Sequence, residues 1–169
     1  GWWSPVTRGI IPLDAVHISR SLQKNLTQFS VRVDTCFTDV MKACGSSARP
    51  HGWINNEFID AYTLLHRSGW ANSVEVFLDE QLVGGIYGVR IGRLFAGESM
   101  FHTHTDASKT ALVALAALLD AAGVVLFDVQ WTTEHLKSLG AVDITRDSYL
   151  RLLKEAQKSP ILRQTKTHG

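Results

Sequence analysis

The stretch FDVQ, residues 127–130, places an acid and an amide two positions apart near the end of an apolar run. The whole run, GVVLFDVQW, is typical of a buried strand, in which alternate side chains point to the same side. Asp128 and Gln130 are therefore expected to project from one face, roughly 7 Å apart along the chain. Such a pair could hold a polar group of a substrate and accept its proton. It could also cap the following helix or bond nearby backbone.

A second candidate is GESMF, residues 97–101, which places Glu98 and Met100 on one face of a predicted strand. Gly97 leaves room beside them, and methionine is an adaptable liner of apolar pockets. The alternative is an ordinary core strand that carries one surface acid.

Metal and cofactor signals are weak. His102 and His104 lie on one side of an extended segment, but two histidines alone do not make a metal site. Cys36 and Cys44 match no common zinc spacing. The stretch GGIYG lacks the Lys-Ser/Thr of a phosphate loop and indicates a bulge or a close backbone approach. No metal and no cofactor are expected.

The composition is that of an ordinary globular protein, with 169 residues, 45% of them hydrophobic and 20% charged, and a net charge of +1. This length allows one domain, or one domain with a small satellite. We find no signal peptide and no apolar run long enough to span a bilayer. A cytoplasmic protein without membrane contact is expected.

The charge is unevenly distributed. Between Val16 and Val33 lie four basic side chains and no acid: His17, Arg20, Lys24 and Arg32. Such a stretch could meet phosphate. It could equally be the solvated surface of a helix and a strand. A strong, nonspecific nucleic-acid binder would be more basic.

Periodicity and turn residues predict the layout of the chain. Residues 2–14 are broken by Pro and Gly and are expected to be irregular, whereas residues 106–123 form the clearest helix, capped by Asp106 or Ser108. Strands are predicted over 29–35, 73–89 with a turn at Asp79-Glu80, 93–101, 123–131 and 141–144; helices over 36–44, 55–69, 132–140 and 146–158.

The second half of the chain alternates strands and helices after a hairpin. This order predicts an α/β (α+β) fold with a mixed sheet and packed helices. Ligands in such sheets bind near the carboxyl ends of central strands, and Asp128 and Gln130 fall near such an end.

An ordered set of stretches closely resembles the leucyl/phenylalanyl-tRNA–protein transferase family of bacteria, from Trp2 to about Leu153. The stretches are WWSP, HISRSL, GWI, HRSGWANSVEV, LVGGIYGV, GESMF, DASKTAL, FDVQ and HLKSLGA. The resemblance implies a fold like that of the Gcn5-type N-acetyltransferases. Residues 1–55 would be a small N-terminal region, a remnant of the family's N-terminal domain. Residues 56–158 would form the acyltransferase-like catalytic domain, and residues 159–169 a loose tail.

The family implies transfer of Leu or Phe, and sometimes Met, from aminoacyl-tRNA to proteins or peptides with N-terminal Arg or Lys. The product is a degradation signal. The donor is an activated ester, and the attacking α-amine has a pKa near 7.7–8.0. The enzyme therefore needs mainly to position the amine and manage its proton. Asp128 and Gln130 match the family's DxQ pair and are the expected catalytic residues.

The donor contacts follow from the same resemblance. The terminal adenosine would stack on Trp3 (or Trp2) and Trp53, and Arg8, Arg20 and Lys24 would contact tRNA phosphates. The Leu or Phe side chain would enter a pocket formed by Ile86, Phe95, Gly97, Glu98, Ser99, Met100 and Leu115.

Two other functions stay open. One is an acyl-CoA-dependent N-acetyltransferase on the same fold, although the expected [RQ]-x-x-G-x-[GA] loop is missing from the matching stretch HTHTDASKTAL. The other is a non-catalytic recogniser of basic N-termini or of charged tRNA.

Overall fold

The computed structural model describes residues 5–45 and 54–158 of the chain. These residues form seven strands and six α-helices, with one short 3-10 helix. The strands are β1 Thr7–Ile10, β2 Ser30–Val33, β3 Ala71–Leu78, β4 Gln81–Ile91, β5 Leu94–His102, β6 Leu126–Gln130 and β7 Val142–Thr145. The helices are η1 Leu13–Ala15, α1 Arg20–Leu26, α2 Phe37–Cys44, α3 Asn56–Arg67, α4 Ala107–Ala121, α5 Glu134–Lys137 and α6 Arg146–Gln157.

All seven strands join one sheet in the order β2-β3-β4-β5-β6-β1-β7. Neighbouring strands are antiparallel except β5 and β6, which are parallel. Helix α4 connects this parallel pair, because parallel neighbours need a long crossover. The mixed sheet with packed helices confirms the predicted fold class.

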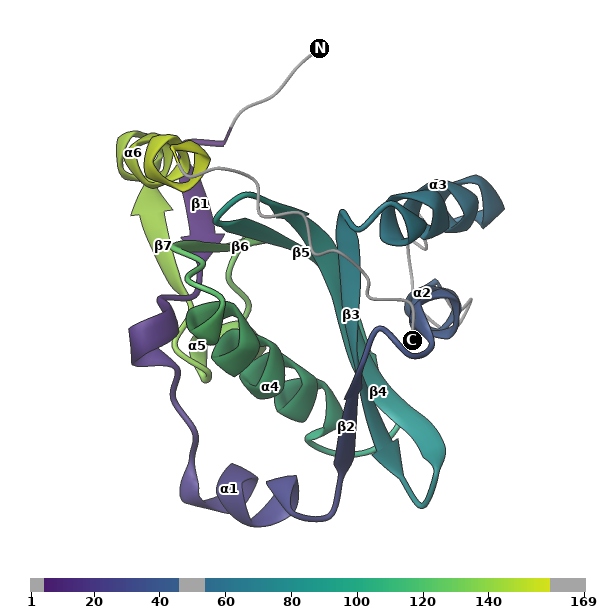
Figure 1. Cartoon of the computed structure of the whole chain (residues 1–169). Coiled ribbons are helices and arrows are strands. Elements are labelled where there is room, and N and C mark those ends of the chain that lie inside the picture. Colours follow the sequence, from purple (N-terminus) through teal and green to yellow (C-terminus); the bar gives the residue numbers. More distant parts are fainter. Residues whose placement is uncertain (1–4, 46–53, 159–169) are drawn as a thin grey trace.

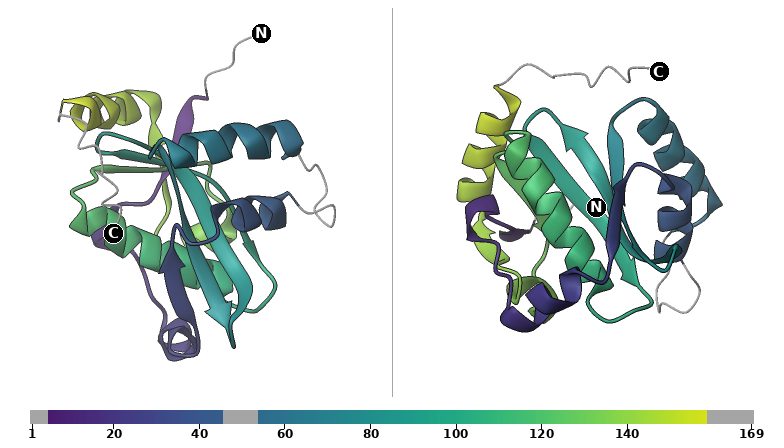
Figure 2. Two further views of the ribbon diagram at one scale, coloured as in Figure 1. Left: turned by 45° about the vertical axis from the view of Figure 1, so that its right-hand side comes forward. Right: turned by 60° about the horizontal axis from the view of Figure 1, so that its bottom comes forward.

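Helices cover both faces of the sheet (Figure 1, Figure 2). Helix α4 crosses one face, where its Ala and Leu side chains bury the largest core against β3 to β6. On the other face, α2 and α3 cover β3 to β5 around Tyr87, and α6 covers β1, β6 and β7. The face opposite α4 is therefore covered by α2 and α3 over one part and by α6 over another. The site described below lies at β5 and β6, where these two parts meet.

The central hairpin forms as predicted. Asp79 and Glu80 join β3 to β4 with φ of 48° and 62°, the conformation that a two-residue hairpin turn of type I′ requires. Gly84 in β4 confirms the close backbone approach that GGIYG indicated. A Cβ there would lie 2.7 Å from the Cβ of Ala107 at the start of α4.

The prediction for the first residues was wrong in part. Thr7–Ile10, expected to be irregular, forms β1 between β6 and β7. A four-residue strand shows too little alternation to be recognised, and its partners lie more than 115 residues away in the sequence. Long-range pairing therefore decides the structure of this segment and brings Arg8 next to β6.

The predicted cap of α4 was right about the position of Asp106 and wrong about its side-chain bond. Asp106 occupies the N-cap position with φ of 65°, but its side chain makes no capping bond. Its carboxylate accepts from Asn25 Nδ2 at 2.8 Å and lies 3.3 Å from Lys109 Nζ. Ser108 lies inside the helix and pairs with His102 Nδ1 at 3.2 Å. The Asp106 and Ser108 side chains therefore bond with Asn25 and His102 instead of capping the helix.

The division at residue 55 stays a prediction. Residues before it supply β1 and β2 to the same sheet as the later strands. The predicted tail, 159–169, lies outside the described residues. No helix in the described part of the chain is long and apolar enough to cross a membrane.

Candidate active site

The site begins where β5 and β6 separate. These parallel strands pair over only three positions, ending at Ala96 and Asp128. Beyond that point β5 bulges, because Tyr87 and Gly88 of β4 face Ser99 and Gly97 and leave Glu98 without a partner across the strands. The strands diverge at the carboxyl end of β6, the place where ligands bind in such sheets.

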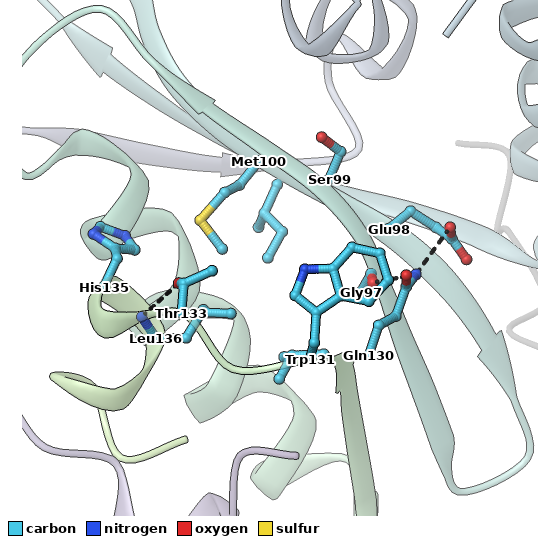
Figure 3. A pocket seen from close by; sticks show the side chains of 11 residues that line it. Gly97, Glu98, Ser99, Met100, Gln130, Trp131, Thr133, His135 and Leu136 are labelled. Atoms are coloured by element: carbon cyan, nitrogen blue, oxygen red, sulfur yellow. Dashed lines mark hydrogen bonds between the residues drawn. The ribbon is translucent and has the colours of Figure 1, made fainter. Parts of the chain in front are cut away.

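A cavity of about 340 Å³ lies between the separated strands and α5 (Figure 3). Figure 3 shows Glu98 and Gln130 at one end and His135 at the other, with Met100 between them. One end is therefore polar and the middle apolar. The lining comprises Ile86, Gly97, Glu98, Ser99, Met100, Val129, Gln130, Trp131, Thr133, His135 and Leu136.

The bulge corrects the prediction that Glu98 and Met100 share a face. Met100 packs toward the core beneath α4, whereas the Glu98 carboxylate interacts with the hydroxyl of Tyr62, which packs against the core on the opposite side. Burial raises the pKa of Glu98, although the neighbouring Tyr62 hydroxyl acts in the other direction. Glu98 is thus a carboxylate that gains a proton more readily than an exposed glutamate.

Gln130 sits in a strained turn. Its φ is 68°, and the Trp131 N–H donates to the Val129 carbonyl oxygen at 2.8 Å, which together define the rare form of γ-turn. Such a conformation costs on the order of 1–3 kcal/mol and persists only where its surroundings enforce it. The turn aims the Gln130 amide at β5, where Nε2 donates to Gly97 O at 3.3 Å and to Glu98 Oε2 at 3.5 Å.

Asp128 helps to hold Gln130 in this turn. Its carboxylate is only 2% exposed, and its Oδ1 accepts the Gln130 backbone N–H at 2.7 Å. Arg8 donates from Nε and Nη2 at 2.9–3.1 Å, and the Tyr149 hydroxyl donates at 2.7 Å. The sequence predicted adjacent acid and amide side chains; instead, the acid holds the backbone that carries the amide.

The partners of Asp128 come from distant segments. Arg8 lies in β1, with its side chain 29% exposed, and Tyr149 lies in α6. Burial, followed by the bond to Asp128, raises the pKa of Tyr149 to about 12, so the hydroxyl remains a donor. The phosphate contact expected of Arg8 stays a prediction. In the structure this guanidinium binds Asp128.

His135 was not singled out from the sequence. Its Nε2 is buried and has no hydrogen-bond partner among the described residues. Burial lowers the pKa of His135, and nearby Lys109 and His102 lower it further, so the ring is neutral at pH 7. A histidine three residues before a Ser-Leu-Gly turn gives no signal of this placement, which depends on how α5 packs.

The other predicted residues divide into four groups. Ile86, Gly97, Ser99 and Met100 line the cavity, whereas Phe95 and Leu115 lie in the core and line a separate hollow of about 150 Å³. Arg20 and Lys24 are exposed on α1. Trp2, Trp3 and Trp53 lie outside the described residues. In that described part, no three His, Cys, Asp or Glu side chains gather as a metal site.

Solved structures share this fold. FemX aligns with a TM-score of 0.59 at 12% identity, covering 91% of this chain and 65% of that one. An aminoglycoside acetyltransferase from an uncultured soil metagenomic sample aligns with a TM-score of 0.51 at 8% identity, covering 79% and 89%. At such low identity the likeness shows the fold alone, which is that of the Gcn5-type N-acetyltransferases.

Sequence relatives are much more similar. The leucyl/phenylalanyl-tRNA–protein transferase of Tolumonas auensis is 45% identical over 93% of this chain and 69% of its own length. The transferase of Hyphomonas neptunium is 49% identical over 91% of this chain and 61% of its own length. That of Paramagnetospirillum magneticum is 47% identical over 92% of this chain and 76% of its own length. A family model described as leucyl/phenylalanyl-tRNA protein transferase matches residues 10–154. The chain therefore belongs to the leucyl/phenylalanyl-tRNA–protein transferase family, a family of aminoacyltransferases.

Proposed function

We propose that this protein transfers Leu or Phe, and sometimes Met, from aminoacyl-tRNA to the α-amine of proteins with N-terminal Arg or Lys. The product would be a degradation signal made in the cytoplasm. The observation that carries the proposal is the cavity in which an apolar wall around Met100 meets a polar end at Glu98 and Gln130. An apolar donor side chain and a cationic acceptor need these two environments next to each other.

The acceptor end suits an amine. Among the described residues that line the cavity, Glu98 is the one carboxylate, and its raised pKa brings it closer to that of the α-amine. Gln130 Nε2 lies next to it, and the amide oxygen of the same side chain can accept from an amine N–H. An N-terminal ammonium would therefore meet one acid and one amide oxygen.

The reaction exchanges one bond for another and moves one proton from the amine to the leaving oxygen. The amine nitrogen bonds to the ester carbonyl carbon, and the carbon–oxygen bond to the ribose breaks. Glu98 accepts the proton that the amine loses and passes it to the departing ribose oxygen, which becomes a hydroxyl, so that Glu98 returns to its ionised form. Gln130 orients the amine, and Asp128 acts through Gln130 as a positioning residue.

The tRNA contacts remain as the sequence predicted them. Arg20 and Lys24 of α1 would contact phosphates, and Trp53 with Trp3 or Trp2 would stack on the terminal adenosine. Residues 56–158 would carry the chemistry, and residues 1–55 would contribute donor binding.

The direct test mixes the purified protein with radiolabelled Leu-tRNA and a peptide that begins with Arg. We expect label in the peptide, and none when the first residue is Ala or when the N-terminus is acetylated. Acetyl-CoA serves as a second donor, because peptide acetylation would support the acyl-CoA alternative. Binding of Leu-tRNA without any transfer would support the non-catalytic alternative.

A further inference from the structure

We propose that a basic hollow next to the cavity holds the backbone phosphates that precede the terminal adenosine of the donor. The proposal rests on the proposed function, since it assumes an RNA donor. The basic hollow is lined by His17, Ser19, Leu22, Lys109, Lys137, Ser138 and Leu139 and has a volume of about 500 Å³. Lys109, Lys137 and His17 provide a phosphate-binding set that is separate from the basic face of α1.

The basic hollow brings three separate segments together. His17 and Ser19 precede α1, Lys109 lies in the first turn of α4, and Lys137 ends α5. Its described lining holds three basic side chains and no carboxylate. The apolar contribution comes from Leu22 and Leu139, which are 2% and 1% exposed and belong to the main core. The basic side chains therefore lie around two leucines that the core holds in place.

Each of the two lysines that line the basic hollow forms an ion pair within its own helix or its cap. Lys109 Nζ lies 3.3 Å from Asp106 and Lys137 Nζ lies 3.2 Å from Glu134, each within one helical turn. The lysine side chains are 31% and 50% exposed. Glu134 is 92% exposed and an exposed pair of this kind is weak, so an incoming phosphate can compete with it for Lys137. Asp106 is 11% exposed and also accepts from Asn25, so Lys109 keeps this partner while its remaining N–H groups can donate to phosphate.

Helix α5 separates the basic hollow from the cavity. His135 and Leu136 line the cavity, and the next three residues, 137–139, line the basic hollow. This helix has four residues, and with a rise of 1.5 Å per residue it is about 6 Å long. Lys109 also contributes to the lowered pKa of His135. The positive charge of the basic hollow therefore acts electrostatically on a residue that lines the cavity.

The orientation of the donor follows from the two ends of the cavity. The reacting ester belongs at the Glu98–Gln130 end, and Figure 3 shows His135 at the opposite end. An RNA chain that leaves the cavity past His135 meets the basic hollow on the other side of α5. The phosphates closest to the ester would then contact Lys137 and Lys109, and more distant ones would reach Arg20 and Lys24.

The test compares three ligands that differ in the number of phosphates: puromycin, C-C-puromycin and full-length Leu-tRNA. Puromycin mimics an aminoacylated adenosine without backbone phosphates, and C-C-puromycin adds two nucleotides. Affinities for the first two, and apparent KM for the third, are measured on the Lys109→Gln/Lys137→Gln double variant. Lys154→Gln, an exposed lysine of α6, is the matched control, and Arg20→Gln reports the basic face of α1.

We expect the wild type to bind C-C-puromycin more tightly than puromycin, with a salt slope steeper by about 0.7 for each phosphate contacted. In the double variant, the affinity for C-C-puromycin should fall about 10-fold and the apparent KM for Leu-tRNA should rise about 10-fold. Its affinity for puromycin should stay within about two-fold of the wild-type value. Arg20→Gln should affect tRNA alone, and Lys154→Gln should affect no ligand.

Equal binding of puromycin and C-C-puromycin by the wild type would overturn the inference, as would an equal loss of both ligands in the double variant. Either result leaves the proposed function standing if Leu still reaches an Arg peptide. Absence of transfer from Leu-tRNA by the wild type would instead overturn the proposed function. The melting temperature of each variant separates loss of binding from loss of folding.

Discussion

Asp128 and Glu75 are both carboxylates buried in the same sheet, at 2% and 0% exposure, yet their surroundings differ. Glu75 in β3 accepts from the Thr35 backbone N–H at 3.1 Å, from the Thr35 hydroxyl at 2.8 Å and from the Ser73 hydroxyl. These donors are neutral and join β3 to the short connection before α2. Asp128 instead accepts from an arginine, a tyrosine and the backbone of a strained turn.

The difference teaches that burial and saturation with hydrogen bonds do not identify a functional acid. Both carboxylates are satisfied, as buried polar groups must be. Of the two, only Asp128 bonds to a residue that lines the cavity. Its carboxylate accepts the backbone N–H of Gln130 and so fixes the position from which the Gln130 side chain extends. Glu75 should therefore act on stability alone, and Asp128 on both stability and turnover.

The largest effect is expected for Asp128→Asn. An amide at this position loses the charge that faces Arg8 and cannot accept every N–H and O–H donor now present. We expect single-turnover transfer of Leu to fall about 10²–10³-fold, because a misplaced reacting group costs on the order of 10²-fold. Stability should also fall, by about 2–3 kcal/mol, since one partner of a largely buried pair is removed.

Rates for this variant are measured below its melting temperature, with the folded fraction determined by circular dichroism. Puromycin affinity should stay near the wild-type value, because Asp128 does not line the cavity. A folded Asp128→Asn protein with a wild-type transfer rate would contradict the comparison.

Glu98→Gln should have the next largest effect, a loss of about 10- to 100-fold in transfer at pH 7. Glu98 can accept a proton only when ionised, and its pKa is raised by burial. Transfer should therefore decline as pH falls, beginning above the pH at which an ordinary glutamate is protonated. The decline at this pKa should be absent in Glu98→Gln, measured as kcat against pH with saturating donor.

The same variant has a distinctive stability. A raised carboxyl pKa means that the ionised form is disfavoured in the fold, so the contribution of Glu98 is most favourable at low pH and is lost as pH rises through that pKa. Removing the charge should leave the melting temperature at pH 8 unchanged or higher. A marked drop at pH 8 would assign Glu98 to structure, like Glu75.

Met100→Ala should lower the use of Leu-tRNA by about 10-fold, because losing one apolar wall is worth about 1–3 kcal/mol. The change should appear in kcat/KM for Leu and Phe donors while puromycin still binds. Leu150→Ala, an exposed leucine of α6, is the matched truncation and should change neither. Equal kinetics for Met100→Ala and Leu150→Ala would remove Met100 from the donor pocket.

Glu75→Gln should have the smallest effect on turnover, within about two-fold of wild type per folded molecule. Its cost should appear in the free energy of unfolding, about 1–3 kcal/mol, because a buried hydrogen-bonding group is left imperfectly paired. Urea unfolding and single-turnover assays on the same preparation provide both numbers. A large loss of turnover in the folded Glu75→Gln protein would erase the distinction between the two acids.

Local patterns predicted much of this molecule. The alternation in β3 and β4, the Ala and Leu content of α4 and the Asn55 cap of α3 all lie within short windows, so their structure could be read from the chain. The same kind of local pattern singled out Gly97, Glu98 and Met100, which line the cavity.

Long-range pairing placed the rest. The bulge at Glu98 reverses which side that residue faces, and only its partner strand reveals it. The bonds from Arg8 and Tyr149 to Asp128 join positions 120 and 21 residues away, and nothing local predicts them. The burial of His135 Nε2 without a partner among the described residues depends on how α5 packs.

The most direct test of the account is a double-mutant cycle on Asp128→Asn and Gln130→Ala, read as the single-turnover rate of Leu transfer to an Arg peptide. If Asp128 acts by holding Gln130, each single variant should lose about 10²–10³-fold, and the double variant should be only about three-fold slower than the slower single, because residues that act as a unit are not additive. Losses that multiply in the double variant, with all three proteins folded and binding puromycin, would contradict the claim that Asp128 works through Gln130.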